Sequence, residues 1–435
     1  ASNSNGNYTI ILVGARERLQ YENGTTFYTD LKGNKEVCNS SPFEFLKSYY
    51  SSIDQQAYQS KAKEIDVGYI DGFLGYIGYD MVKVFEPILS ESMDNLIDQT
   101  NIPDMDLILP KLTLVVSHKY ATITLISSVD QFINQFESIE SELKNSYNYT
   151  PLKPIKNDQG GSFIFTKEKF FSMVDQSKEM ILSGDVFQIL MTNRYIRKAE
   201  VDPLSFYRVL RLKNPSPYMY LMEYEDFSIV GSSPEVMVRL QEGEILLRPI
   251  AGTRKRGGTQ KRDLELEEEL LSDPKELAEH LMLIDLGRND VGRVAQTGSV
   301  RVEEMMHVER YSHVMHIVSD VYAVLRDDKD MFDLLAAVFT AGTMTGAPKI
   351  RAMELIAQFE GVKRGYYSGT IGYFGFDGNM DSAITIRTAL IKDNEVILQA
   401  GDGVVADSQH ELEYLEVTNK LGALTSTLDD LIQPE

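Results

Sequence analysis

The sequence predicts a folded protein of mixed helices and strands, and two observations support this prediction. Hydrophobic residues make up 43% and charged residues 25% of the 435 residues, which is ordinary for a globular enzyme. Segments with the alternation of β-strands also recur between segments with helical periodicity along the whole chain. This length suffices for two domains or for one large domain with two lobes.

The part of the chain up to residue 150 is predicted to consist of strands with a few helices. A strand is expected at residues 8–13, followed by turns near Gly24 and Gly33 and a helix at residues 43–50. Residues 68–80 are dense in glycine and aromatic residues, and we expect these glycines to let neighbouring strands approach closely. Strands within residues 107–126 and an amphipathic helix at 130–145 follow.

A polar segment at residues 151–161 contains two prolines and a glycine pair, which is typical of a linker. We therefore expect residues 1–150 and 162–435 to form two regions. The second begins with a helix at 167–183 and a strand at 185–196. Gln188 is a polar residue within an apolar face of that strand, so it is either a satisfied core glutamine or a functional one.

The middle of the second region leads to a helix with an acidic start. A helix is predicted at 205–212, strands at 218–223 and 227–230, a hairpin at 236–249 and a flexible basic turn at 249–258. In the next helix, 271–290, Ser272 or Asp273 can be the N-cap, and Glu276 would complete a capping box. Glu276 and Glu279 share one helical face. Taken alone, this pair is a solvated acidic helix start, which the helix dipole favours.

The following segments contain histidines and a glycine-rich loop. A strand is predicted at 300–304, and residues 311–324 carry His313 and His316, either as a metal-binding pair or with one histidine reaching a substrate. A helix at 331–339 precedes residues 340–361, which resemble a phosphate loop. Ala-Pro separates Gly346 from Lys349 there, so we exclude nucleotide binding. The loop opens onto a helix whose free N–H groups can hold a carboxylate.

The C-terminal part ends in a second acidic helix. Strands are predicted at 366–373 and 383–390, with Arg387 in mid-strand either in a salt bridge or available to an anion. A strand at 395–399 is expected to run into a turn at 401–403, and the last helix to begin near Ser408 with a capping box to Glu411. Along this helix one face carries Glu413, Glu416 and Lys420.

The two Glu-x-x-Glu pairs together indicate a site for a hard cation. Carboxylates, completed by water and an anionic substrate, are the usual environment of Mg²⁺. The chain has one cysteine and six histidines, which disfavours zinc. The spacing alone does not establish that the two helices meet.

Charge and composition restrict the partners and the compartment. The net charge of −22 argues against nucleic acid and anionic membranes as partners. No apolar run is long enough to span a membrane, and the start ASNSNG is not a signal peptide, although the chain may be processed because it lacks an initial Met. A lone Cys38 permits no internal disulfide, so we expect a cytoplasmic protein.

Motifs throughout residues 165–425 resemble those of chorismate-utilising enzymes, above all the large subunits of anthranilate synthase. The N-terminal region is similar through GYIDGFLGYIGYD alone. This resemblance implies an α+β fold of two layered, mainly antiparallel sheets with helices packed outside and the active site between the lobes. The matching stretches are GDVFQILMTNRY, NPSPYM, GSSPE, RPIAGTRKRG, ELAEHLMLIDLGRND, RYSHVMHIVS, AGTMTGAPKIRAMELI, YYSGTIGYF, SAITIRTA and GDGVVADS with ELEYLEVTNK.

The resemblance also implies a set of site residues. Mg²⁺ would be held directly by Glu279 and Glu416 and through water by Glu276 and Glu413, and Glu276 would be the general acid for loss of the ring hydroxyl. His316 and Thr343 would lie near the enolpyruvyl group. The residues implied to bind chorismate are Gly252, Thr253, Tyr367, Arg387, Gly401, Asp402, Gly403 and Lys420.

Two positions indicate the reaction within the family. Related enzymes that add water carry a lysine base where this chain has Gln188, and an amide tolerates ammonia as the nucleophile. Many relatives that aminate C4 carry a lysine where this chain has Ala251. We therefore expect amination of chorismate at C2 followed by elimination of pyruvate to anthranilate, the first step of tryptophan biosynthesis. The alternatives are a C4-aminating enzyme of folate synthesis and an inactive regulator that binds tryptophan or chorismate.

The resemblance finally implies partners. Cys38 lacks the surroundings of a nucleophile, so ammonia would come from a separate glutaminase subunit in a hetero-oligomer. Feedback inhibition by tryptophan in the family uses the segment that contains Pro217, Tyr218 and Met219, together with a Leu-Leu-Glu-Ser stretch that this chain does not contain.

Overall fold

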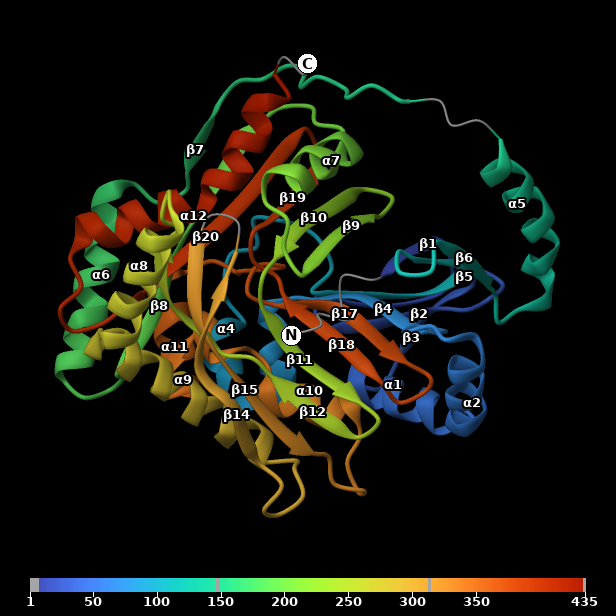
Figure 1. Ribbon diagram of the computed structural model, residues 1–435, viewed down its shortest axis with the longest axis horizontal. Coiled ribbons are helices and arrows are strands. Elements are labelled where there is room, and N and C mark those ends of the chain that lie inside the picture. The colour runs from blue at the N-terminus through green and yellow to red at the C-terminus, as the bar shows by residue number, and fades with distance from the viewer. Residues whose placement is uncertain (1–7, 146–148, 312–313, 433–435) are drawn as a thin grey trace.

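Two β-sheets form the centre of the computed structural model, with helices around them (Figure 1). The structure describes residues 8–145, 149–311 and 314–432. Every pairing between the named strands is antiparallel. The α+β fold of two layered antiparallel sheets is therefore confirmed.

Within the described residues the first sheet has 13 strands and draws on both halves of the chain. Its strands are β1 (Tyr8–Glu22), β2 (Thr25–Thr29), β3 (Lys35–Cys38), β4 (Gly72–Ile77), β5 (Met105–Ser117), β6 (Thr122–Ile126), β11 (Val236–Gln241), β12 (Glu244–Leu247), β13 (Ile250–Lys255), β14 (Arg301–Arg310), β15 (Val314–Val324), β17 (Thr370–Gly375) and β18 (Met380–Ile384). Their order is β13-β15-β12-β11-β18-β17-β4-β5-β1-β2-β3, with β14 also on β15 and β6 on β5.

The second sheet has seven strands in the described part of the chain. They are β7 (Gly161–Phe163), β8 (Gln188–Lys198), β9 (Tyr218–Glu223), β10 (Phe227–Ser233), β16 (Gly346–Ala347), β19 (Thr388–Lys392) and β20 (Glu395–Val404). The order is β16-β8-β20-β19-β10-β9, and β7 pairs with β8.

The helices lie outside the sheets, and α6, α8, α9 and α12 gather on the left in Figure 1. The α-helices are α1 (Pro42–Ser51), α2 (Gln55–Ile65), α3 (Val82–Phe85), α4 (Ser90–Met93), α5 (Phe136–Lys144), α6 (Lys167–Leu182), α7 (Pro203–Lys213), α8 (Gln260–Ser272), α9 (Pro274–Gly292), α10 (Met331–Val338), α11 (Lys349–Glu360) and α12 (His410–Asp430). The 3₁₀ turns are η2 (Tyr79–Met81), η3 (Pro87–Leu89), η4 (Asp130–Gln135) and η5 (Gly342–Met344).

The glycine-rich segment at 68–80 joins the two halves of the chain. Strand β4 pairs with β17, and Gly75 stands opposite Gly372 in that register. A Cβ at Gly75 would lie 2.0 Å from the carbonyl oxygen of Asp106, so only glycine fits between these strands. The expected close approach is confirmed. The division of the chain at 151–161 stays a prediction.

A buried arginine fixes the loops beneath the second sheet. Arg364 is 1% exposed and pairs with Glu360 at 2.8 Å. Its other N–H groups donate to the carbonyl oxygens of Met344 (2.7 Å) and Leu190 (2.9 Å). A buried guanidinium needs such partners, because an unpaired one would cost several kcal/mol, of order 3–5. These bonds hold strand β8 against the loop that contains η5.

Three local predictions in the second region are wrong. Residues 250–255 form strand β13 on β15 rather than a flexible turn, and helix α8 follows where none was expected. The strand expected at 383–390 is interrupted, because Arg387 has a left-handed φ of +52°. The turn expected at 401–403 is part of β20, where Asp402 stands opposite Met191 of β8.

The two acidic helices begin differently from one another. Asp273 caps α9 as expected, but the side chain of Glu276 pairs with Arg254 and does not complete a capping box. Helix α12 begins at His410 without a side-chain cap, so the capping box to Glu411 is wrong, and Glu411 pairs with Lys167 instead.

None of the helices in the described ranges combines the length and the apolarity needed to cross a membrane.

Candidate active site

The starts of the two acidic helices lie near one another, beside strands β8 and β20 of the second sheet. Gln188 begins β8, and its Nε2 donates to Oε1 of Glu279 on α9 at 3.2 Å. Strand β8 pairs with β20 along its length, and α12 packs on β20. The Lys275 ammonium on α9 lies 3.2 Å from Asp407, just before α12. The fold therefore brings together elements that are more than 90 residues apart.

Carboxylates gather at this junction. Burial raises the pKa of Glu279, and the charges of Glu276 and Asp402 raise it further. Burial also raises the pKa of Glu413 to about 7, and its hydrogen bond with Asp402 adds to the rise. Asp402 stays ionised, because Lys420 donates to its Oδ1 at 2.7 Å and lowers its pKa against the effect of burial. Mutual repulsion among these groups favours a bound cation.

The donor set suits a hard cation. The four glutamates supply only carboxylate oxygens, which Mg²⁺ and Ca²⁺ prefer. Burial first, and neighbouring carboxylates second, raise the pKa values of Glu279 and Glu413, and a bound cation would act against both effects. Across the described residues, no three His, Cys, Asp or Glu side chains form a ready metal cluster. Water and substrate oxygens would have to complete the shell.

His316 lies on β15 opposite Thr253 of β13. Its Nδ1 is 3.0 Å from the carbonyl oxygen of Gly252 and 3.1 Å from Oγ1 of Thr253. A carbonyl only accepts, so Nδ1 carries the proton of the neutral ring and Nε2 keeps a free lone pair. Burial lowers the pKa of His316, and the charges of Arg387 and Lys420 lower it further. The imidazole is thus neutral and basic at Nε2.

Strand β13 is locked against the start of α9. Gly252 has a left-handed φ of +65°, and a Cβ there would lie 3.0 Å from Oε2 of Glu276. Oε1 of Glu276 accepts from Arg254 at 2.9 Å, and Arg254 also pairs with Asp273, the N-cap of α9. Glycine at 252 therefore lets the main chain pass directly beside the Glu276 carboxylate.

Arg387 and Tyr367 lie between the sheets. Arg387 NH1 donates to the carbonyl oxygen of Lys420 at 2.9 Å. Burial lowers the pKa of Arg387, while the nearby Tyr367 and Glu416 act against that change. A guanidinium has five N–H donors, so this bond leaves it capacity for a carboxylate. The Lys420 ammonium also donates to the Gly401 carbonyl at 3.0 Å.

A further carboxyl group, Glu235, has no predicted role but belongs to the site. It is 8% exposed, and Oγ1 of Thr343 donates to its Oε1 at 2.8 Å. Burial raises the pKa of Glu235 to about 7, while Thr343 and Lys420 act in the opposite direction. The only sequence signal is an acidic residue in the short connection between strands β10 and β11, within the stretch GSSPE.

The predicted tryptophan-binding segment occupies another place in the fold. Tyr218 and Met219 begin β9, at the edge of the second sheet, and Pro217 precedes them. The Tyr218 phenol donates to Asp381 of β18 at 2.8 Å, which links the two sheets. The predicted role of His313 lies outside the described residues.

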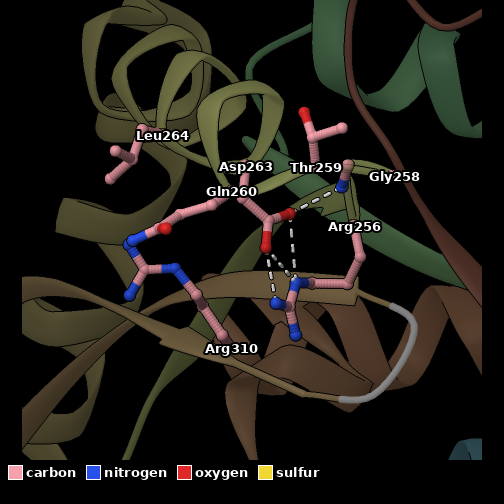
Figure 2. Close-up of a pocket in the computed structure, with 8 residues that line it drawn as sticks. Arg256, Gly258, Thr259, Gln260, Asp263, Leu264 and Arg310 are labelled. Atoms are coloured by element: carbon pink, nitrogen blue, oxygen red, sulfur yellow. Dashed lines mark hydrogen bonds and ion pairs between the residues drawn. The ribbon is translucent and has the colours of Figure 1, made fainter.

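A pocket of about 500 Å³ opens beyond the end of β13. Figure 2 shows Arg256 and Asp263 pointing toward one another on its wall, with Arg310 on the opposite side. Arg256 Nε donates to Oδ2 of Asp263 at 2.9 Å. Both arginines are engaged in ion pairs, Arg310 with Glu267, so the pocket wall is largely neutralised.

Comparisons with known proteins agree with this arrangement. The family model described as chorismate binding enzyme matches residues 1–426. Anthranilate synthase component 1 of Aquifex aeolicus is 46% identical over 375 residues, which cover 82% of this chain and 74% of that protein. The same component of Acinetobacter calcoaceticus is 41% identical, with coverage of 97% and 87%. The crystal structure of anthranilate synthase component I from Streptococcus pneumoniae TIGR4 superposes with a TM-score of 0.85 at 34% identity, covering 96% of this chain and 92% of that one.

Proposed function

The chain belongs to the family of chorismate binding enzymes, and from this premise we propose that it is the aminating subunit of an anthranilate synthase. It adds ammonia at C2 of chorismate with loss of the ring hydroxyl, and then eliminates pyruvate to give anthranilate. The observation that carries this proposal is the neutral Gln188 side chain at 3.2 Å from Glu279. An amide cannot deprotonate water, but it leaves ammonia, already a nucleophile, free to attack.

Chorismate lies between β13, β20 and the loops around Arg387. Arg387 pairs with a carboxylate of the substrate, and Lys420 adds a second positive charge beside Asp402. Tyr367 is buried beside Arg387. The close main-chain contacts come from Gly252, Thr253 and residues 401–403.

Glu279 and Glu416 would be the residues that hold Mg²⁺, and Glu276 and Glu413 would support the ion from around them. Two features support this assignment. The carboxyl groups of Glu276, Glu279 and Asp402 lie close together, and a hydrogen bond joins Asp402 to Glu413. When bound, the cation supplies the positive charge that an acidic protein needs to hold a dianionic substrate. The residues around it then orient chorismate.

Glu235 provides the proton for the departing hydroxyl, in place of Glu276. A pKa of about 7 leaves much of the Glu235 population protonated at neutral pH, as a general acid requires. The Glu276 side chain is instead engaged in a 2.9 Å ion pair with Arg254. Thr343 orients the Glu235 carboxyl through its hydroxyl group.

His316 accepts a proton in the elimination of pyruvate. Its Nδ1 proton is committed to the Gly252 carbonyl, so the free Nε2 is the basic atom. Burial keeps the ring neutral before the reaction. His316 would then be positively charged only after it has accepted the proton and before it releases it.

Ammonia reaches this site from a separate glutaminase subunit, and tryptophan inhibits through the segment 217–219. The name of the relatives, anthranilate synthase component 1, supports a multisubunit enzyme. The position of Tyr218 between the two sheets supports a regulatory role, because a ligand there would bias how the sheets sit on one another. A cytoplasmic location stays a prediction.

We expect the purified protein to make anthranilate from chorismate, ammonium and Mg²⁺ without any added lyase. Anthranilate is followed by its fluorescence, and pyruvate by a coupled dehydrogenase. Accumulation of an aminated product without anthranilate would indicate the C4-aminating alternative. Absence of any chorismate consumption, with chorismate still bound, would favour a regulator and contradict the proposal.

A further inference from the structure

Tyr311 stands beside the predicted catalytic histidine but has no role assigned so far. It follows β14 directly, and its backbone N–H donates to the carbonyl oxygen of Val314 at 2.8 Å, which closes the connection to β15. The Tyr311 ring lies edge-on to the His316 ring, with centroids 5.6 Å apart and an interplanar angle of 63°. Aromatic pairs prefer this edge-to-face geometry, and it restricts the orientation of both rings.

An ion-pair chain anchors the phenol group of Tyr311. Its hydroxyl donates to Oε2 of Glu309 at 2.8 Å. Oε1 of Glu309 accepts from Arg248 at 2.6 Å, and Arg248 also pairs with Asp320 at 2.7 Å. Burial and then Glu309 raise the pKa of the phenol, so it remains protonated and keeps donating. The side chain therefore has one fixed direction.

The main chain of Tyr311 is held from the opposite side. Arg256 NH1 donates to the Tyr311 carbonyl oxygen at 2.5 Å. Arg256 is itself fixed by Asp263, as Figure 2 shows, and the N–H of Gly257 also donates to that carboxylate at 2.6 Å. The loop that follows β13 thus holds the main chain of Tyr311, while Glu309 holds its side chain.

We propose that Tyr311 is a positioning residue for His316, and that its ring keeps the Nε2 lone pair aimed at the substrate. The Gly252 carbonyl fixes the tautomer through Nδ1, and the Thr253 hydroxyl contacts the same nitrogen, but contacts at this single ring atom still allow the ring to pivot about it. The Tyr311 edge removes that freedom. This inference rests on the proposed function, because it assigns Tyr311 to the elimination step in which His316 accepts a proton.

Steady-state kinetics distinguish a residue that orients His316 from one that binds chorismate. If Tyr311 positions a proton acceptor, Tyr311→Leu lowers kcat for anthranilate formation by about tenfold and changes KM for chorismate by less than about twofold. Tyr311→Phe keeps the ring edge and restores most of kcat. Tyr322→Leu on β15 is the matched control, since that ring contacts the Arg301 guanidinium at 4.9 Å and we expect wild-type kinetics.

A spectroscopic measurement separates positioning from general destabilisation. The chain has six histidines, so ¹⁵N-histidine labelling with His316→Asn for assignment resolves the His316 ring nitrogens. We expect a single neutral tautomer with the proton on Nδ1 in the wild type and in Tyr311→Phe, and averaged nitrogen shifts in Tyr311→Leu.

Two results would overturn the proposal. One is a Tyr311→Leu enzyme with wild-type kcat and an unchanged His316 tautomer. The other is a raised KM at wild-type kcat, which would make Tyr311 a substrate contact. If the wild type itself makes no anthranilate, the proposed function fails, while the nitrogen shifts still decide whether Tyr311 orients His316.

Discussion

Glu279→Gln is expected to lower kcat/KM for anthranilate formation by about a hundred- to a thousandfold, because it removes one charge from the centre of the cation site. Glu279 is the residue on which the site converges: Gln188 donates to it, and Glu276 and Asp402 lie close enough to raise its pKa. The glutamine variant keeps the shape of the side chain, so the fold should be unchanged. Anthranilate fluorescence at saturating ammonium measures the loss.

A matched variant shows whether this loss is local. Glu268 is exposed on the neighbouring helix α8, and Glu268→Gln removes the same charge away from the site. We expect wild-type activity from it. Raising the Mg²⁺ concentration should partly restore Glu279→Gln if the lost charge serves the cation. Activity within about twofold of wild type at ordinary Mg²⁺ would show that Glu279 is no ligand.

Glu235→Gln is expected to lower kcat for anthranilate formation by at least about a hundredfold while leaving chorismate binding largely intact. Its pKa is raised to about 7, so the proton-donating form is present below that pH and is lost as the pH rises through it. In the wild type, kcat/KM should therefore fall above about pH 7 on the Glu235 limb. Glu235→Gln removes the acid, and the residual rate should lose this limb.

Glu276→Gln tests whether Glu276, and not Glu235, is the general acid. Glu276 is ion-paired with Arg254, so we expect this variant to weaken Mg²⁺-dependent binding and to retain the alkaline limb of the pH profile. A Glu276→Gln enzyme that binds chorismate and Mg²⁺ normally but has lost the limb would contradict the assignment of Glu235. The general acid implied by the family resemblance, Glu276, would then stand.

The sequence predicts the helices and strands that carry the site residues. It does not predict how these elements come together in the fold. The spacing of Glu276 and Glu279, and of Glu413 and Glu416, places each pair on one helical face, because helical periodicity is a local property. Their convergence depends on the pairing of β8 with β20, residues that are about 200 positions apart, and no local pattern encodes that register. The contact of Gln188 with Glu279 also requires helix α9 to pack on β13 and β15 of the first sheet, which no local pattern predicts either.

The site features that the sequence did not predict depend on burial and on backbone conformation. Glu235 looks like any loop glutamate in the sequence, and only its 8% exposure in the structure distinguishes it. The break at Arg387 is hidden within an alternating stretch, since the left-handed φ of +52° is imposed by the surrounding sheets. Residues 401–403 resemble a turn because of their glycines. Glycine suits this position inside a strand, since a Cβ at Gly401 would lie 2.7 Å from the carbonyl oxygen of Met191.

The most direct test of the cation-dependent chorismate site is calorimetric titration of chorismate into the protein with Mg²⁺ and then with EDTA. If the carboxylates of α9 and α12 hold the cation that receives the substrate, chorismate binds with Mg²⁺ and its binding heat disappears with the chelator. Equal affinity in both titrations would contradict the account, because the acidic helices would then take no part in holding the substrate.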